Sequence, residues 1–576
     1  MKKFYLLYKS LVEVFCACPK YNIGMFSVLL LMGLMPALNI YSTGKLVSLF
    51  ENNIATESSI ILIIGIWGLS MLLPTLLSPL VNYLQSHINQ LVTNKIIKKI
   101  IYKNSTFNGL QSFDDVDLQN SINILKNQSR FRPTNFLVNS VIVIRELVTI
   151  TSLAIILFHI KWWIPIALLV SSIPLAYINF SVASFSWKAL MKSSHNSRLM
   201  EYFTSLSFSR EAQKDIHLFN AHSLIYQKYS VAFDKVYREL KNTQLKTFAK
   251  PIPFQIITAI SISFILYAVY KQSTSALITI SSVVVLLQSI VLLNNRLEGF
   301  IEHSSLLYEV LDYFEKYFDF LNTSDTINDG TDEIYVIESI EFKNVYFKYP
   351  NSEKYIINKV SFLAKSGESI AIVGHNGAGK STLMHLICRF WDVTEGEILI
   401  NNKNIKNYKI ANLRSCIGAV LQDFFKFNLT IHENITFNTN DNLGFNYSHK
   451  IGLPNDVNAN TMIGKSYGGI ELSGGQWQKL AILRCFHTKG SLVILDEPTS
   501  AIDPKAEVEL YSEFKNISEN KLTFMVTHRL GSVNNTDRVL VFDQGKLVQD
   551  DTPNKLKTVD GLFKDLWNLQ ANMYTK

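Results

Sequence analysis

A nine-residue glycine-rich segment, Gly374–Thr382, carries the clearest chemical signal in the sequence. Its residues fit the pattern G-x-x-x-x-G-K-[ST], which wraps backbone N–H groups around phosphate oxygens. The apolar run Ser369–Val373 before it is typical of a buried parallel strand, and Leu383–Ile387 after it is typical of a helix. The motif requires this order of strand, loop and helix, because the helix N-terminus adds favourable potential for an anion. We therefore predict a nucleoside triphosphate site rather than an ordinary glycine-rich turn.

Two side chains of this loop have specific predicted roles. Lys380 is expected to reach the β- and γ-phosphates, and the hydroxyl of Ser381 is expected to bind Mg²⁺. The predicted ATP ligands in the loop are Gly374, His375, Asn376, Gly377, Ala378, Gly379, Lys380, Ser381 and Thr382. ATP and Mg²⁺ are thus the expected cofactors.

Three further features of the second half add candidate contacts to ATP. Tyr349 lies upstream of the loop, where its ring can stack on adenine, although a surface tyrosine before a proline fits equally well. Gln422 is predicted to contact Mg²⁺ or the attacking water. A second glycine-rich turn opens a helix, and its candidate ligands are Ser473, Gly474, Gly475 and Gln476. Because the two turns begin different helices, the second is not expected to serve the same ATP.

The catalytic candidates stand at the ends of two apolar strands. Leu492–Glu497 ends in two carboxylates, of which Asp496 suits a metal site and Glu497 suits a general base. The run Thr523–His528 ends in a histidine that can sense the γ-phosphate. A lone histidine at a strand end is more often structural, but the preceding motifs favour a catalytic role. We predict Glu497, His528 and Lys380 as catalytic residues, and Ser381, Gln422 and Asp496 as Mg²⁺ ligands.

The composition indicates a membrane domain joined to a soluble one. Of 576 residues, 48% are hydrophobic and 18% are charged, and the long apolar runs crowd the first half. The net charge of +8 sits mainly in loops between these runs, which favours a membrane-topology signal over nucleic-acid binding. Five scattered cysteines predict neither a disulfide framework nor a metal cluster, and favour a reducing cytoplasmic face.

Six segments are apolar and long enough to cross a bilayer, which takes about 20 residues. They lie near residues 23–42, 59–84, 135–158, 162–183, 252–271 and 276–294. The connections 85–134 and 184–251 are long and basic. The positive-inside rule therefore predicts that both connections and both termini lie in the cytoplasm. Residues before the first span have helical apolar spacing, which predicts an interfacial helix.

Two features of this half remain open at the level of sequence. Charged or amide residues at Arg145–Glu146 and Asn294–Arg296 either contact cargo or reach the membrane surface from helix ends. The segments Phe113–Leu125 and Ser209–Phe219 have apolar periodicity, so we expect them to dock on a cytoplasmic domain rather than form solvated loops.

Together these motifs resemble those of an ABC exporter half-transporter, over nearly the whole chain. The motifs that the resemblance implies are the A-loop at Tyr349, the Walker A at Gly374–Thr382, the Q-loop at Gln422, the signature at Leu472–Gln476, the Walker B at Leu492–Glu497, the D-loop at Ser500–Asp503 and the switch histidine at His528. Ile502 departs from the usual Leu, and the segment Phe437–Tyr467 is short. In the family, cytoplasmic coupling turns contact the ATPase near the Q-loop, here Gln422 and the Phe424–Phe425 pair.

A narrower likeness concerns the cargo. Gln422–Ile431 and Trp477–Lys479 resemble the corresponding segments in exporters of nisin-type lanthipeptides, which lack an N-terminal peptidase domain. This likeness implies a peptide cargo. The alternatives are a lipid or multidrug exporter, and, in another class, an ATP-gated channel or a non-transporting regulator. Loss of Glu497 or His528 would favour that other class, and both are present.

We therefore expect an α-helical membrane domain of the ABC exporter type with six spans at residues 1–321, a linker at 322–337 and an α/β P-loop ATPase domain at 338–576. The expected function is ATP-driven export of a lanthipeptide or other bacteriocin by alternating access. The expected partners are a second copy of the chain, membrane lipid, the exported peptide and peptide-modifying enzymes, with no nucleic acid. The expected location is the plasma membrane, with the N-terminus and the ATPase domain in the cytoplasm.

Overall fold

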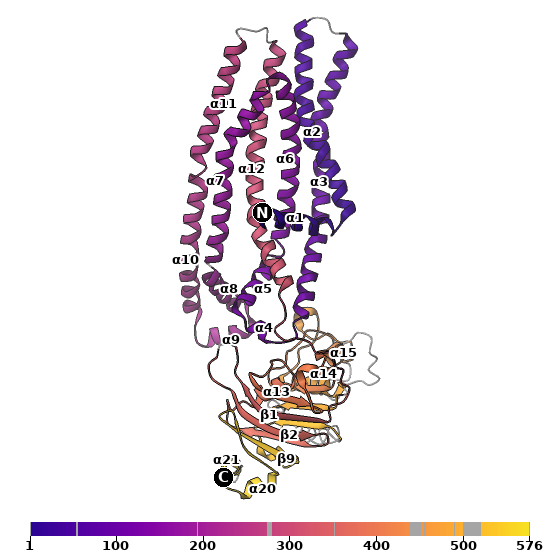
Figure 1. Cartoon of the computed structure of the whole chain (residues 1–576), viewed down its shortest axis with the longest axis vertical. Coiled ribbons are helices and arrows are strands. Elements are labelled where there is room, and N and C mark those ends of the chain that lie inside the picture. The colour runs from indigo at the N-terminus through magenta and orange to yellow at the C-terminus, as the bar shows by residue number, and fades with distance from the viewer. Residues whose placement is uncertain are drawn as a thin grey trace. The chain divides into compact units, whose positions relative to one another are not determined.

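The computed structural model describes residues 2–52, 56–192, 194–273, 279–350, 352–437, 451–453, 457–488, 490–498 and 520–574. The chain divides into two units (Figure 1). The helical unit comprises Met1–Lys103 and Asn120–Thr323, and the sheet unit comprises Asn104–Gln119 and Ser324–Lys576. A short piece from the first half of the chain, Asn104–Gln119, thus belongs to the sheet unit.

The helical unit is built almost entirely of helices. They are α1 Lys2–Phe15, α2 Pro19–Asn52, α3 Glu57–Ser105, α5 Val116–Gln128, α6 Arg132–Ile160, α7 Trp163–Lys192, α8 Ser194–Phe208, α9 Arg210–Leu218, α10 His222–Ala249, α11 Ile252–Ser273 and α12 Ile280–Asn322. Among the described residues, six stretches are long and apolar enough to cross a membrane: Pro19–Glu51, Glu57–Ser105, Arg132–Ile160, Trp163–Val182, His222–Lys271 and Ile280–Asn322. This confirms the six predicted spans.

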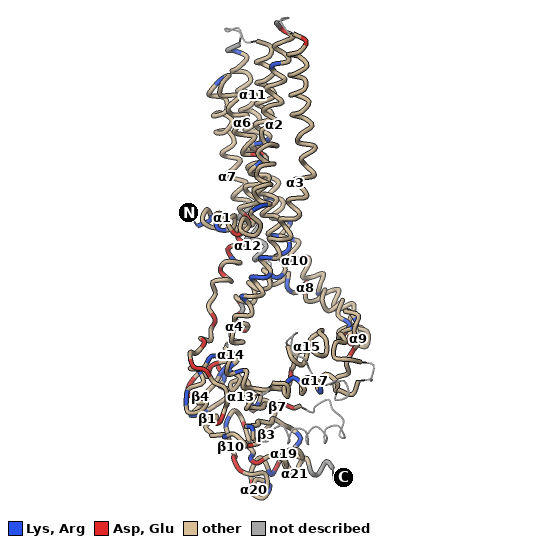
Figure 2. Tube along the Cα trace, turned by 90° about the vertical axis from the view of Figure 1, so that its right-hand side faces the viewer, with Lys and Arg blue, Asp and Glu red and all other residues tan. Residues whose placement is uncertain are grey.

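Several of these helices continue far beyond the predicted spans. The 49 residues of α3 extend over about 70 Å at 1.5 Å per residue, more than twice the roughly 30 Å of a hydrocarbon core. Figure 2 shows the membrane-length helices mostly free of charged residues. The predicted connections 85–134 and 184–251 are accordingly largely helical, with short turns before α9 and around α4 (Gln111–Asp114).

The longest packing seam of the helical unit runs along α12, which contacts α6, α7 and α2. Its buried side chains recur at intervals of four and three residues, at Leu286, Ile290, Leu293 and Leu297. That spacing keeps them on one helix face. They pack with residues of α6 such as Leu153 and Leu157, which are fully buried. This seam forms the apolar core of the unit.

The first helix, α1, is amphipathic, as the sequence predicts. Leu6 and Val14 are buried, whereas Phe4 and Tyr8 are exposed. On the polar side, the carboxylate of Glu13 lies 2.6 Å from Nζ of Lys99 on α3. An exposed aromatic face opposite an ion-paired face suits a membrane interface.

The sheet unit contains two sheets and short helices. Its strands are β1 Ser339–Phe347, β2 Ile357–Lys365, β3 Ser369–Gly374, β4 Glu395–Ile400, β5 Lys403–Asn404, β6 Ile417–Val420, β7 Leu492–Asp496, β8 Leu522–Val526, β9 Arg538–Asp543 and β10 Lys546–Asp551. Its helices are α4, α13 Lys380–Ile387, α14 Ile410–Ser415, α15 Ile431–Thr436, α17 Gly474–His487, α19 Leu530–Val533, α20 Pro553–Thr558 and α21 Leu562–Tyr574, with 3₁₀ turns η1 Ile405–Asn407 and η2 Lys465–Tyr467.

The six-stranded sheet positions the chemistry. Its order is β10-β9-β3-β8-β7-β6, and β3, β8, β7 and β6 pair in parallel. The four-stranded sheet has the order β2-β1-β4-β5. Both sheets share a core in which Ile370, Leu383 and Phe524 are fully buried. Because parallel strands end at the same edge, the loops after β3, β7 and β8 meet there.

Candidate active site

The glycine-rich loop joins β3 to α13, as the strand–loop–helix pattern predicts. Gly379 has a φ of +97°, and a Cβ there would lie 2.9 Å from the carbonyl oxygen of Ile356. Only glycine fits such a position without strain. The ammonium of Lys380 donates to the carbonyls of Gly374, at 2.9 Å, and His375, at 3.0 Å. The lysine is therefore folded back over the loop, with its charge at the mouth of the phosphate site.

A cleft of about 600 Å³ lies in front of this loop. Its lining residues are Tyr349, Ile356, Asn376, Gly377, Gly379, Lys380, Ser381, Thr382, Gln422, Glu497 and His528. Most of the predicted ATP-site residues of the first glycine-rich loop and of the strand ends therefore lie around one cleft. Gly374, His375 and Ala378 belong to the loop without lining this cleft, and Asp496 is buried and does not line it either. Ile356 is a lining residue that sequence reasoning missed.

Tyr349 stands at one end of the cleft. Its hydroxyl lies 3.1 Å from Oγ1 of Thr382, and its ring meets the edge of Trp391 at 5.2 Å between centroids. The tyrosine is thus held in place by the loop below and by an aromatic neighbour behind. Such a fixed ring offers a face on which a base can stack.

Glu497 lies at the centre of a small polar cluster. Its Oε1 is 3.0 Å from Nε2 of His528, and its Oε2 accepts from the amide of Gln422 at 3.3 Å. Its carbonyl accepts from the side chain of Gln478 at 3.2 Å, and its φ of +49° is unusual for a residue other than glycine. Two separate segments therefore hold this carboxylate, and a third holds the backbone of the same residue.

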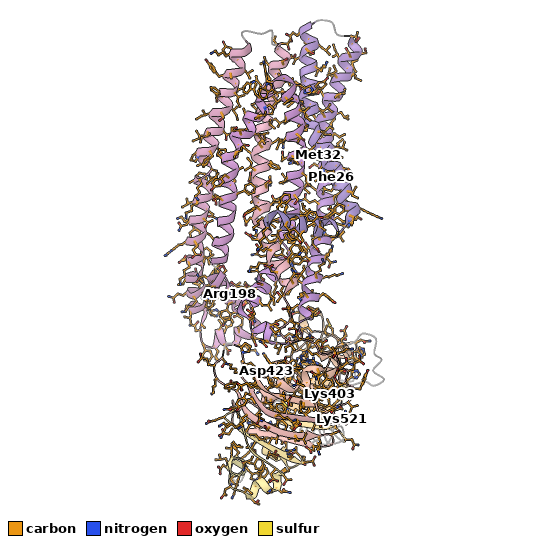
Figure 3. The ribbon with its side chains drawn as sticks, in the orientation of Figure 1. Phe26, Met32, Arg198, Lys403, Asp423 and Lys521 are labelled. Carbon is orange, nitrogen blue, oxygen red and sulfur yellow. The ribbon has the colours of Figure 1, made fainter. Side chains whose placement is uncertain are left out.

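Asp496 is 2% exposed, and its Oδ1 is buried with no hydrogen-bond partner among the described residues. Burial raises the pKa of Asp496, while a hydrogen bond from Ser381 lowers it. An unsatisfied buried carboxylate oxygen next to a hydroxyl is costly unless a cation occupies the space. Two of the three predicted Mg²⁺ ligands, Ser381 and Asp496, therefore fit a hard cation. Gln422 lies at the same cleft, and near it is Asp423, which Figure 3 labels.

Burial lowers the pKa of two cationic groups at the cleft, Lys380 and His528. Burial lowers the pKa of Lys380, although Glu497 and Asp496 act in the opposite direction. Burial, and then the charge of Lys380, lower the pKa of His528, whereas Glu497 raises it. His528 is therefore neutral at physiological pH and can either donate or accept a hydrogen bond.

The second glycine-rich turn lies apart from the cleft of its own chain. Ser473 is the N-cap of α17, and its side chain accepts from the backbone of Gln476 in a capping box. The side chain of Gln476 also donates to the carbonyl of Gly452 at 3.1 Å. No residue of this turn is among the described residues that line the cleft. The predicted D-loop, Ser500–Asp503, lies outside the described residues.

The segment Asn104–Gln119 packs on the sheet unit through its backbone. Arg414 donates to the carbonyl of Asn108 at 2.7 Å, and the backbone N–H of Leu110 donates to the carbonyl of Phe390 at 3.0 Å. Burial lowers the pKa of Arg414, which still stacks its guanidinium 5.0 Å from the ring of Phe390. Apolar periodicity predicted docking by Phe113–Leu125, whereas these contacts lie earlier in the chain, and residues from Asn120 on belong to the helical unit.

The place of contact differs from the one that the family resemblance implies. Within the segment, the carboxylate of Asp114 on α4 accepts from the indole N–H of Trp391 at 3.2 Å. Trp391 in turn touches Tyr349, so α4 meets the base end of the cleft rather than Gln422. The sequence carried one weak signal for this, namely two aromatic residues directly after α13, because large apolar side chains at a loop edge often form a docking site.

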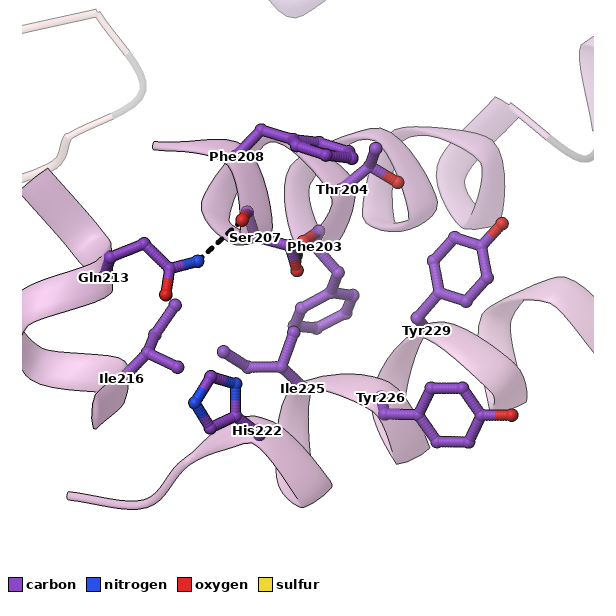
Figure 4. A pocket seen from close by; sticks show the side chains of 10 residues that line it. All are labelled: Phe203, Thr204, Ser207, Phe208, Gln213, Ile216, His222, Ile225, Tyr226 and Tyr229. Carbon is purple, nitrogen blue, oxygen red and sulfur yellow. Dashed lines mark hydrogen bonds between the residues drawn. The ribbon is translucent and has the colours of Figure 1, made fainter. Parts of the chain in front are cut away.

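The second predicted docking segment becomes α9. Together with α8 and α10 it encloses a pocket that Phe203, Phe208, Ile216, Tyr226 and Tyr229 help to line (Figure 4). Gln213 of α9 donates to the carbonyl of Ser207 at 2.6 Å and closes the turn. Phe208 is 86% exposed, so an apolar surface is presented there.

Among the polar residues of the helical unit, Glu146 is not near a helix end. It lies halfway along α6, is 4% exposed, and accepts from Arg145 on α6 and Arg296 on α12, each at 3.1 Å. Glu146 therefore pairs with charged residues inside the helical unit. One and two heptads before Glu146 on α6, Asn139 contacts His303 at 2.9 Å and Arg132 contacts Glu309 at 3.0 Å.

Comparison with known proteins places these features in a family. Residues 357–500 match the family model for ABC transporters. The subtilin transport ATP-binding protein of Bacillus subtilis is 26% identical over 558 residues, which are 93% of this chain and 89% of that protein. The ATP-dependent lipid A-core flippase of Haemophilus ducreyi is 30% identical over 448 residues, 75% of each chain. A solved bacterial Atm1-family ABC exporter with ATP bound superimposes with a TM-score of 0.82 at 20% identity, over 96% of this chain and 98% of that one.

Proposed function

This chain belongs to the ABC transporter family, as a membrane exporter half-transporter that couples ATP hydrolysis to transport, and from that premise we propose that its cargo is a lanthipeptide-type peptide. The observation that carries the proposal is the similarity to the subtilin transport protein, which extends over 93% of the chain and so includes the membrane half. Cargo recognition belongs to that half, because the ATP chemistry is common to all members. The sheet unit and the N-terminus are proposed to face the cytoplasm.

The proposed chemistry assigns one role to each polar residue of the cleft. Glu497 takes a proton from the attacking water, and His528 holds the carboxylate and contacts the γ-phosphate. Lys380 leaves its loop carbonyls to neutralise charge that develops on the transferred phosphate. Tyr349 stacks on the base.

The residues that would hold Mg²⁺ are Ser381 and Asp496, with Gln422 at the edge of the site. When bound, the ion neutralises negative charge on the phosphate oxygens and orients them. The unsatisfied Oδ1 of Asp496 supports this assignment. Glu497 is not assigned to the ion and acts as the general base. Its carboxylate oxygens contact His528 and Gln422, which hold it in place.

We further propose that two copies assemble head to tail. The turn Ser473–Gln476 begins α17 yet lies apart from the cleft that contains Lys380, so one chain leaves each ATP half enclosed. A second copy would place its own Ser473–Gln476 turn against the side of the ATP that the first chain leaves open. The glycine-rich N-terminus of a 14-residue helix suits a phosphate.

Coupling between ATP and cargo is proposed to run through Asn104–Gln119. Its contacts form a continuous path from Asp114 through Trp391 to Tyr349. An adenine ring that displaces or fixes Tyr349 would therefore bias the position of α4. Moving a two-state equilibrium from 1:99 to 99:1 takes about 5.5 kcal/mol of differential binding.

The proposal is tested in inside-out proteoliposomes that contain the purified full chain. We expect ATP-dependent uptake of a dehydrated, leader-bearing lanthipeptide precursor and stimulation of ATPase activity by that peptide. Glu497→Gln serves as the matched inactive control. Uptake that is equal with and without ATP would contradict the peptide assignment.

The second candidate cargo is a lipid, because a relative named as a lipid A-core flippase reaches 30% identity. The same proteoliposomes distinguish a lipid cargo from a peptide cargo. ATP-dependent movement of a fluorescent anionic lipid between leaflets, together with no response to the peptide, would assign the chain to lipid transport instead.

A further inference from the structure

The C-terminal helix α21 lies against the part of the sheet unit that carries the catalytic histidine. Its Phe563 is fully buried in a cluster with Val373 of β3, the strand that feeds the phosphate loop. The backbone N–H of Phe563 donates to Oε1 of Gln549 at 2.9 Å, and Trp567 lies 4.1 Å beneath the ammonium of Lys557. The helix is therefore firmly anchored at its first two turns.

One side chain of α21 reaches the histidine directly. The amide nitrogen of Gln570 donates to the carbonyl of His528 at 3.0 Å, across 42 residues of sequence. His528 follows the end of β8 by two residues and lies in the short connection to α19. Its backbone is thus beyond the sheet ladder and is held at its carbonyl by a residue from another element.

A cavity of about 520 Å³ separates α21 from the phosphate loop. Leu566, Leu569 and Gln570 line one side, and His375, Asn376 and His528 line the other. The space gives the connection after β8 room to shift if the hydrogen bond from Gln570 is lost. The contact between His528 and Glu497, 3.0 Å long, would then lengthen with it.

We propose that Gln570 is a positioning residue for ATP hydrolysis, which acts by fixing the backbone of His528 so that the imidazole faces Glu497. The inference rests on the proposed catalytic role of His528. Catalytic groups must be held to within about 0.5 Å, and a displacement of about 1 Å can cost as much as 100-fold in rate. Helix α21 is thereby part of the hydrolytic machinery, although none of its residues is among the described residues that line the ATP cleft.

The test compares variants of the purified full chain in proteoliposomes. Gln570→Glu and Gln570→Met both keep the length of the side chain but remove the donor, whereas Gln570→Lys keeps a donor. We expect the first two to lower kcat by about fivefold with KM for ATP changed less than twofold, as for the loss of one hydrogen bond. We expect Gln570→Lys to recover most of the rate. Asn568→Ala, on the exposed face of the same helix, is the matched control.

The variant His528→Ala tests the catalytic role of His528 separately from the positioning role of Gln570. If it hydrolyses ATP at the wild-type rate, the proposed role of His528 is overturned and the inference with it. If it is inactive while both donor-less variants keep the wild-type kcat, the role of His528 stands and the positioning role is wrong. A loss that is equal in Asn568→Ala, or a rise in KM that accounts for the whole change, also overturns the inference, because either result indicates a general effect on α21.

Discussion

Glu497 is held by contacts from His528 and Gln422 before any nucleotide arrives. Glu497→Gln keeps the shape of the side chain but removes the base. We expect turnover to fall by about 10²–10³-fold, which is the range of a single general-base contribution. ATP affinity, measured with a fluorescent analogue, should change little. Turnover near the wild-type rate in this variant would assign the base to another residue.

The neutral state of His528 gives a pH dependence with a definite sign. Burial and Lys380 lower its pKa from the usual 6.5, so the folded protein protonates this ring only below that pH. Between the two pKa values the unfolded chain binds more protons, so the stabilising contribution is present above 6.5 and is lost as pH falls through the folded pKa. We expect kcat to remain steady from pH 8 to 6.5 and to fall below it. An acid limb centred above pH 7 would contradict the lowered pKa.

At the scale of elements, α4 contacts the base end of the cleft through Trp391. Trp391→Phe keeps an aromatic ring against Tyr349 but removes the N–H that Asp114 accepts. We expect ATPase activity within about twofold of wild type and a severalfold loss of ATP-driven transport, since only one hydrogen bond in the path is lost. Trp162→Phe, at an exposed tryptophan between α6 and α7, is the control. Parallel loss of both activities would exclude this path.

The seam between α6 and α12 combines apolar packing with an ion cluster in which Glu146 is buried and both arginines are partly exposed. Removing the carboxylate in Glu146→Ala leaves Arg145 and Arg296 without their shared partner. Breaking a fully buried pair costs about 3–5 kcal/mol, and the cost here is smaller because water reaches both arginines. We expect a marked fall in thermal stability in detergent. A second change, Arg296→Met, should restore part of it, and the double-mutant cycle measures the coupling. Additive effects of the two changes would show that the pair is not coupled.

At the scale of the whole molecule, each half-transporter carries one phosphate loop and one separate glycine-rich turn. We expect ATP to stabilise a dimer of two chains, most strongly in Glu497→Gln, where the nucleotide is bound but not consumed. Light scattering of the detergent-purified variant with and without ATP measures the mass. The Ser473→Arg variant, which blocks the proposed contact, should remain able to bind ATP in its own cleft. A monomer with steady ATP turnover would exclude the shared site.

Much of the ATP cleft could be predicted from the sequence, because its parts are short and contiguous. A phosphate loop needs glycines, a lysine and a hydroxyl at fixed spacing, so Gly374–Thr382 can be identified by pattern alone. The spans follow from length and apolarity for the same reason, since roughly 30 Å of hydrocarbon takes about 20 residues. Strand-end residues such as Asp496 and Glu497 were also predictable, because parallel strands end at one edge of a sheet.

The contacts that only the tertiary structure decided join residues far apart in the sequence. Asp114 and Trp391 are 277 residues apart, Glu146 and Arg296 are 150 apart, and Gln570 and His528 are 42 apart. No local pattern encodes such pairs, because each depends on the packing of several elements at once. The sequence by itself determined the phosphate chemistry and the membrane spans, whose causes are local. Folding decided which distant side chains hold the catalytic groups and which buried charges find partners, since an unpaired buried charge is too costly to leave.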